Sequence, residues 1–341
     1  MADERITRTG NDSIMDKASR IKAILNGKTC DRPLYSFWTH FPHVDLDAKS
    51  LAETSYSFFK ELDLDFIKSM PNGMYSILDW GCECDFSQIA SGGVARVTRT
   101  AIEKPEDWNQ LQRLDIEKGS LGRELLSLKL LLRYVHEEAP IIATVFSPMT
   151  TAYKLSGGKV LQHLHTHPEN VINGLGVITE TTCRFAQKAV ELGCAGIFLA
   201  TQMCTEEMMT QAGYIEYCMP YDLSVLEAVR RETWFNVAHI HGNRILFDPV
   251  TQYPVEGISW HVWETPPEVS EFLEKTDASI IVGGFQRSNI SQKNYPAVID
   301  DLNNMLRLTK GSRLILAPGC TVRHPCDRDF LKMIAAEIRI R

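Results

Sequence analysis

The chain has 341 residues, of which 44% are hydrophobic and 23% charged, and its formal net charge is −7. This composition is typical of a folded globular protein with a large core. The absence of a Lys/Arg-rich run argues against a nucleic-acid partner, and no apolar stretch reaches the length of a membrane span.

The first 20 residues are polar and of mixed charge. They lack the apolar segment of a secretory signal, so we predict an intracellular, cytoplasmic protein. The nine cysteines are an odd number spread over a long chain. This is not the dense disulfide framework of a small secreted domain, and we expect most of them to be reduced thiols.

Short apolar runs alternate with amphipathic segments along the chain, which is typical of βα units on a parallel sheet. A helix is predicted over 13–27, with Ser13 as its N-cap and Gly27 as its stop. Eight strands are predicted, at 33–38, 64–69, 140–146, 195–200, 234–240, 257–260, 278–284 and 313–318. Helices are predicted at 48–62, 119–138, 168–192, 214–231, 294–308 and 326–339, and Gly193 follows the third of these as a left-handed stop.

Eight strands with interleaved helices predict an α/β fold, a single (β/α)8 barrel domain over 1–341 with a polar N-terminal arm at 1–13. The alternative is a doubly wound open sheet, but no G-x-G-x-x-G follows any predicted strand. The longest interruption, 71–118, follows the second strand, and its glycines predict a loop with a hairpin.

All strands of a barrel end at one mouth, where chemistry gathers. In "HIHGN" His239 and His241 are two residues apart and share one face of a strand, and Cys320 follows the last strand. Two imidazoles and a thiolate with a fourth position open suit a catalytic zinc site. The alternative is that these are ordinary strand-end residues and a buried thiol.

Other polar residues lie at the predicted strand ends. Asp65 and Lys68, in the second strand, are candidates for an acid–base pair, and His40 and His43, after the first, are candidates for substrate contacts. A structural role is an equal alternative for all four.

Three segments, "FSPMTTAYKLSGG", "GGFQR" and "APGCTV", resemble the uroporphyrinogen decarboxylase superfamily, and the resemblance runs from about residue 15 to the end. It implies a (β/α)8 barrel. The superfamily includes the heme-pathway decarboxylase and zinc-dependent methyltransferases that move a methyl group from a corrinoid protein to a thiol.

The resemblance is closer to the methyltransferase branch. The decarboxylase holds its substrate with arginines where this chain reads "SFWTHFPHVD", and its tyrosine is out of register, with Tyr153 one residue short and Lys154 at the spot. The methyltransferase motif is H-x-C with a second cysteine downstream. His239 and Cys320 match it, and His241 stands at the first cysteine.

The resulting hypothesis is a zinc enzyme with His239, His241 and Cys320 as ligands of Zn²⁺, a small thiol as substrate and a corrinoid protein as methyl donor. The hypothesis adds Asp65 and Lys68 as catalytic residues, and further residues that contact substrate or orient the ligands: His40, His43, Tyr153, Gln286 and, behind the ligands, Asn243. The alternatives are a carboxy-lyase (decarboxylase) for a smaller acid, with Asp65 as the acid, and a non-catalytic barrel. Superfamily members include monomers and dimers, so a homodimer stays open.

Overall fold

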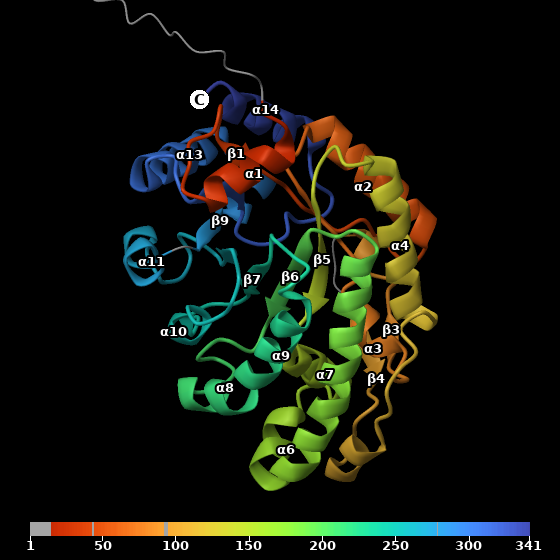
Figure 1. Cartoon of the computed structure of the whole chain (residues 1–341). Coiled ribbons are helices and arrows are strands. Elements are labelled where there is room, and N and C mark those ends of the chain that lie inside the picture. Colours follow the sequence, from red (N-terminus) through yellow and green to blue (C-terminus); the bar gives the residue numbers. More distant parts are fainter. Residues whose placement is uncertain (1–14, 43, 92–94, 278) are drawn as a thin grey trace, which may run out of the picture.

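The chain forms one eight-stranded parallel sheet with helices around its outside (Figure 1). The computed structural model describes residues 15–42, 44–91, 95–277 and 279–341. The strands, in the order in which they neighbour one another, are β1 (Leu34–Tyr35), β10 (Leu314–Pro318), β9 (Ile280–Phe285), β8 (Gly257–Ser259), β7 (Val237–Ile240), β6 (Gly196–Thr201), β5 (Ile141–Phe146) and β2 (Ile67–Lys68).

Hydrogen bonds between β1 and the segment before β2 close the sheet. The backbone N–H of Asp65 donates to the carbonyl of Tyr35 (3.0 Å), and the Ser36 hydroxyl donates to the carbonyl of Phe66 (2.8 Å). The two edges of the sheet therefore meet, and the predicted (β/α)8 barrel is confirmed. Strands β1 and β2 have two residues each, fewer than predicted, because each has a regular ladder on one side only.

The main helices are α1 (Lys17–Leu25), α2 (Ala48–Leu62), α4 (Gly119–Val135), α5 (Pro148–Leu155), α6 (Val160–Thr166), α7 (Pro168–Glu191), α8 (Gln211–Tyr217), α9 (Met219–Val229), α11 (Val269–Lys275), α13 (Tyr295–Thr309) and α14 (Arg328–Arg339). Three shorter ones are α3 (Tyr75–Leu78), α10 (Phe247–Val250) and α12 (Arg287–Ser291). The predicted helix 214–231 is two helices, broken at Cys218. Pro220 near the start of α9 has no N–H and its ring cannot follow a preceding helical turn.

The first helix begins later than predicted. Asp16 is its N-cap and accepts a hydrogen bond from the N–H of Ser19, whereas Ser13 lies outside the described residues. Gly27 (φ +67°) and Gly193 (φ +119°) both have the left-handed backbone expected of helix stops. The single domain over 1–341 stays a prediction, and the predicted arm at 1–13 also lies outside the described residues.

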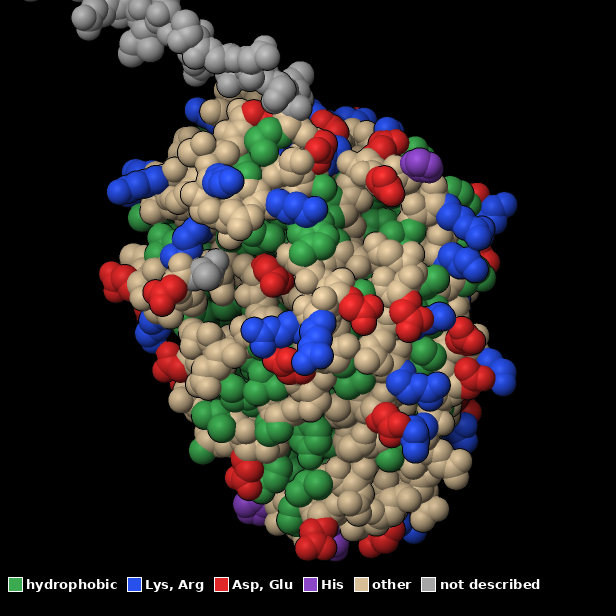
Figure 2. All heavy atoms as spheres, viewed as in Figure 1, with side chains coloured by type: hydrophobic (Ala, Val, Ile, Leu, Met, Phe, Trp, Pro, Cys, Tyr) green, Lys and Arg blue, Asp and Glu red, His purple; other side chains and the backbone are tan. Residues whose placement is uncertain are grey.

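The segment after β2 carries the predicted hairpin, formed by the antiparallel strands β3 (Glu83–Asp85) and β4 (Arg96–Arg99). It lies beside α3 in Figure 1. No helix in the described part of the chain has the length and apolar character needed to cross a membrane. On the face shown in Figure 2, acidic and basic side chains are intermingled over the surface.

Candidate metal centre and its pocket

Four side chains from three strand ends meet at the carboxyl-terminal mouth of the barrel. His239 lies in β7 and His241 one residue beyond it, His261 follows β8, and Cys320 follows β10. One donor atom from each lies within 4.8 Å of the other three. Histidine nitrogens and a cysteine sulfur at such separations could hold a metal ion. The structure thus brings together the three candidate ligands suggested by the sequence and adds a fourth candidate.

Cys320 is held as a thiolate by its neighbours. Burial opposes its ionisation, but its interactions with the imidazoles of His239, His241 and His261 outweigh burial and bring its pKa well below the usual range. The Sγ atom lies 3.5 Å from Nδ1 of His241. A thiolate is the form of cysteine that binds metals and acts as a nucleophile.

His239 is fixed in orientation by its surroundings. Nδ1 lies 3.1 Å from the hydroxyl of Ser259, and the ring stacks on Phe198 with centroids 5.2 Å apart. Burial lowers the pKa of His239 to about 4, so the imidazole is neutral at physiological pH. The neutral ring is the form that coordinates a metal, and a hydrogen bond to its other nitrogen is typical of metal-binding histidines.

We predict that Ser259→Ala weakens metal binding about 10- to 100-fold, because His239 loses the hydroxyl that orients its ring. The measurement is a competition titration against a chelator of known affinity. Ser312→Ala, which removes a surface-turn hydroxyl, is the control and should bind the metal as the wild type does. An unchanged affinity in Ser259→Ala would show that this hydroxyl only packs against the ring.

His261 is the ligand candidate that the sequence analysis missed. Its Nε2 is buried and has no hydrogen-bond partner among the described residues, whereas Nδ1 lies 3.9 Å from Glu264. A buried ring nitrogen without a partner is costly, and a metal ion would satisfy it. The available signal was its position in "SWHVWE", two residues after the last residue of β8, as Cys320 is after β10.

The turn that carries Cys320 packs against the backbone of the β8 end. A Cβ at Gly319 would lie 3.1 Å from both the Cα of His261 and the carbonyl oxygen of Trp260. A side chain at this position would push the two segments apart. Glycine therefore allows Cys320 to approach His261 closely.

The cluster opens into a cavity of about 760 Å³. Its aromatic wall includes Trp38, Phe146 and Phe198, and four lining residues carry basic side chains: Lys68, Lys154, Arg287 and Arg323. Besides His239, His241 and Cys320, two more predicted site residues, His40 and Lys68, line this cavity. Burial lowers the pKa of His40 to about 4, so the ring is neutral. His43 lies outside the described residues.

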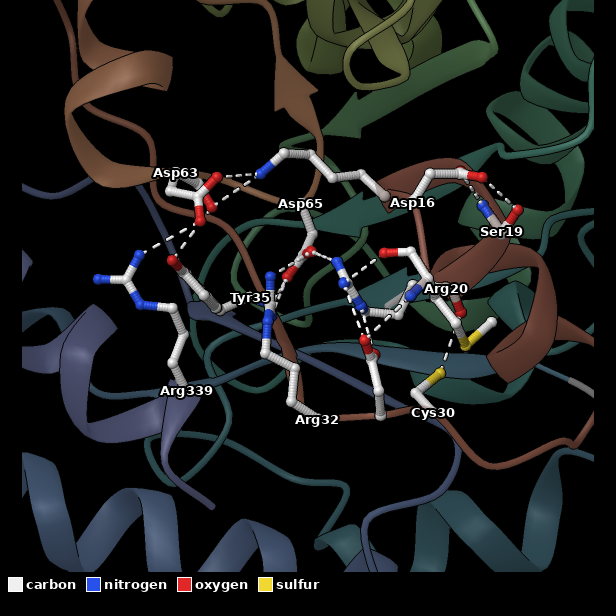
Figure 3. A network of polar contacts seen from close by, with 12 residues as sticks. Asp16, Ser19, Arg20, Cys30, Arg32, Tyr35, Asp63, Asp65 and Arg339 are labelled. Atoms are coloured by element: carbon white, nitrogen blue, oxygen red, sulfur yellow. Dashed lines mark hydrogen bonds and ion pairs between the residues drawn. The ribbon is translucent and has the colours of Figure 1, made fainter. Parts of the chain in front are cut away.

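Asp65 does not reach the cavity, and its predicted catalytic role is wrong. It precedes β2, so it lies at the amino-terminal end of the barrel strands, opposite the mouth. Figure 3 shows its carboxylate between two arginines: Oδ1 accepts from Arg20 (2.9 Å), and Oδ2 accepts from Arg32 (2.8 Å) and from the N–H of Tyr35 (2.9 Å). Residues at this end of a barrel serve stability, and the mouth serves chemistry.

Three further candidates also lie away from the described cavity lining. Tyr153 lies against Gly158: a Cβ built on this glycine would be 3.2 Å from the hydroxyl oxygen of Tyr153. Gln286 is bound to Asp301, to which its backbone N–H donates (3.0 Å). Asn243, which was predicted to orient a ligand, is exposed. The hydroxyl beside the ring of His239 is that of Ser259 instead.

The fold and the site define a (β/α)8-barrel protein with a histidine–cysteine cluster at the carboxyl-terminal mouth. The chain belongs to the uroporphyrinogen decarboxylase (URO-D) family, whose model matches residues 19–339. The predicted resemblance is therefore confirmed.

Curated relatives include the methylcobamide:CoM methyltransferases MtbA of two archaea. That of Methanosarcina acetivorans is 23% identical over 227 residues, which are 66% of this chain and 66% of the relative. That of Methanosarcina mazei is 23% identical over 147 residues, 43% of each chain. The matches thus span less than two thirds of the relatives' lengths. They bear out the prediction of an enzyme closer to the methyltransferase branch than to the heme-pathway decarboxylase.

Solved structures show the same fold. A methyltransferase from Methanosarcina mazei superposes with a TM-score of 0.76 at 17% identity, and the match covers 96% of this chain and 98% of that one. A B12-independent methionine synthase from Shewanella sp. gives a TM-score of 0.54 at 10% identity, with coverage of 91% and 93%. At these identities the likeness concerns the barrel.

Proposed function

We propose that this protein is a zinc-dependent methyltransferase that transfers a methyl group to a small thiol. The carrying observation is the cluster itself, in which three imidazoles and an ionised cysteine converge on one point at the end of a cavity. Its nitrogen and sulfur donors suit zinc better than oxygen-seeking ions such as Mg²⁺ or Ca²⁺. The unsatisfied Nε2 of His261 supports the presence of an ion there.

The residues of the cluster have distinct roles in this proposal. A catalytic zinc site keeps one position for its substrate, so we assign His239, His241 and Cys320 as permanent ligands and His261 as the donor that completes the set without substrate. Zinc supplies a positive charge that lowers the pKa of a bound thiol and keeps it as the nucleophilic thiolate. Ser259 and Phe198 hold the ring of His239 in place, and the aromatic wall of the cavity excludes water from the nucleophile.

The relatives' printed name, methylcobamide:CoM methyltransferase, supports a methylated corrinoid as the methyl donor. His241 stands where the methyltransferase motif has a cysteine, which replaces an anionic ligand by a neutral one. The site of this chain would therefore be more positive, favouring an anionic group bound at the metal. A cytoplasmic location and a homodimer stay predictions.

The rival proposal, decarboxylation of a small carboxylic acid, required an acid beside the substrate. Asp65 was the residue assigned to it, and its carboxylate is bonded to two arginines at the other end of the barrel. The rival proposal is therefore left without the acid that was assigned to it. This leaves methyl transfer as the function that the site supports best.

The test is incubation of the zinc-loaded protein with methylcobalamin and a panel of small thiols. We expect loss of methylcobalamin absorbance with formation of the S-methyl thioether, detected by mass spectrometry, and no turnover in metal-stripped protein. Zinc at one per chain with no thioether from any thiol, together with release of CO2 from a carboxylic acid, would establish the rival instead. A protein that binds neither metal nor thiol would be a non-catalytic barrel.

A further inference from the structure

Two lysine side chains lie in the wall of the cavity, Lys68 buried and Lys154 partly buried. Lys68, at the end of β2, is 8% exposed, and its Nζ contacts only weak acceptors, the Sδ of Met70 at 3.0 Å and the carbonyl of Ser69 at 3.5 Å. Lys154 in α5 donates one hydrogen bond from Nζ to the carbonyl of Gly73 (2.9 Å). Each ammonium group has three donors to satisfy, so both are left with unused hydrogen-bonding capacity facing the cavity.

No carboxylate among the described residues forms an ion pair with either lysine. The one carboxylate among the described lining residues is Asp45, which accepts a hydrogen bond from Asn72 (3.2 Å). Aromatic rings lie where counter-ions would be expected. The ring centroid of Phe198 is 4.7 Å from Nζ of Lys68, and that of Phe146 is 3.6 Å from Nζ of Lys154. Such contacts offset only part of the cost of burying a charge.

Burial consequently lowers the pKa of both lysines to about 7, far below that of a solvated lysine. An exposed lysine such as Lys60 is instead paired, with Glu138 at 2.7 Å. Two ammonium groups that are removed from water, with no counter-ion among the described residues, lower the stability of the empty protein. A negatively charged ligand would compensate these two positive charges and therefore bind favourably.

The two lysines face different parts of the cavity. Nζ of Lys68 lies over the ring of Phe198, which stacks on His239, so this lysine is on the side of the metal cluster. Lys154 instead contacts the carbonyl of Gly73, on the side of the excursion after β2. Between them the aromatic wall offers an apolar surface, and about 760 Å³ is far more than a small neutral thiol would fill.

We propose that Lys68 and Lys154 form an anion subsite and that the ligand of this cavity is an acidic thiol. One acid group binds Lys154, a second binds Lys68 beside the thiol, and the carbon chain between them lies on the aromatic wall. The assignment of the thiol to the metal rests on the proposed function, whereas the recognition of acid groups does not. Arg287 and Arg323 add positive charge to the same lining.

The test is calorimetric titration of the zinc-loaded protein with three probes. Mercaptosuccinate has a thiol and two carboxylates, thioglycerol has a thiol and no acid, and glutarate has two carboxylates and no thiol. We expect mercaptosuccinate to bind at least 10-fold more tightly than thioglycerol, because a hydrogen bond to a charged group contributes a factor of about 10 or more.

Lys68→Met and Lys154→Met should each lose about 10-fold in affinity for mercaptosuccinate and glutarate. Lys154→Met should bind thioglycerol as the wild type does.

Lys129→Met is the matched control, because Lys129 is exposed on α4, and it should bind every probe as the wild type does. The melting temperature separates loss of binding from loss of folding. Removal of a partly buried ammonium group that has no described counter-ion should raise the melting temperature by about 2 °C or more in the ligand-free Lys154→Met protein. A lower melting temperature would identify Lys154 as a structural residue and overturn the proposal.

Metal-stripped protein distinguishes the two proposals. Glutarate binding that persists without metal and is lost in Lys154→Met supports the subsite even if no thiol is ever methylated. Methylation of acidic and neutral thiols with equal KM would leave the proposed function standing and overturn the subsite. Wild-type affinity for glutarate in both lysine variants would also overturn it.

Discussion

Cys320→Ala should abolish stoichiometric zinc binding and reduce the rate of methyl transfer by about 1,000-fold or more. The variant removes the one anionic donor of the cluster and leaves three imidazoles that face one another. Loss of a thiolate ligand weakens a zinc site by far more than loss of a residue that only orients a ligand, which costs about 10- to 100-fold. Elemental analysis of the purified protein and the methylcobalamin assay give the two readouts.

Cys183→Ala is the appropriate control. Cys183 is a half-buried thiol on α7, far from the mouth, with its Sγ 3.6 Å from the carbonyl of Ser224. This variant should keep one zinc per chain and wild-type turnover. Equal zinc content in Cys320→Ala and in the wild type would remove Cys320 from the site, and with it the proposed function.

The barrel was predictable because its signals are local. Buried parallel strands give continuous apolar runs, and each is separated from the next by a helix with its own start and stop residues. Gly27 and Gly193 are examples, because glycine adopts the left-handed backbone of a helix stop more readily than other residues do. The break at Cys218 was missed although Pro220 marks it, since the apolar pattern continues across both helices.

The candidate site was only partly predictable. His239, His241 and Cys320 follow from their places at strand ends, and His261 follows from the same rule but came after the weakest predicted strand. Asp65 was misplaced because it and Lys68 were both assigned to one strand end. Asp65 lies in a bend before β2, whereas Lys68 is the last residue of that strand, so the two residues are at opposite ends of it.

The missing counter-ions of Lys68 and Lys154 illustrate what a sequence does not contain. The sequence shows each lysine but not that its neighbours in space are aromatic rings and carbonyl groups. The decarboxylase arginines are absent from "SFWTHFPHVD", yet the cavity is basic, because residues from other strand ends and from α5 supply the charge. Charge in a pocket is a property of the fold.

The two ends of the barrel therefore use charge in different ways. At the mouth, Lys68 and Lys154 face a cavity and form no ion pair with a described residue. At the opposite end, Arg20 and Arg32 surround Asp65 and satisfy it completely (Figure 3). The first arrangement is suited to binding a ligand and the second to stability, and substitution at Asp65 separates the two.

Asp65→Asn should lower the free energy of unfolding by about 3–5 kcal/mol, because it removes the charge that compensates two largely buried arginines. The side chain keeps its shape, but the amide nitrogen faces the guanidinium of Arg32 or Arg20 as a second donor. Denaturant titration followed by circular dichroism measures this loss. Zinc content and kcat/KM of the folded variant should stay within about 2-fold of the wild type, since the residue lies away from the mouth.

Asp63→Asn provides a control of the same chemistry two residues away. Asp63 is half-exposed, pairs with Lys17 and with Arg339 at its surface, and has a left-handed backbone (φ +52°) that asparagine also adopts. Its loss should cost less than about 1 kcal/mol, as is usual for exposed ion pairs. If Asp65→Asn instead unfolds like the wild type but loses turnover, the carboxylate acts in catalysis and its assignment to the stabilising end of the barrel is wrong.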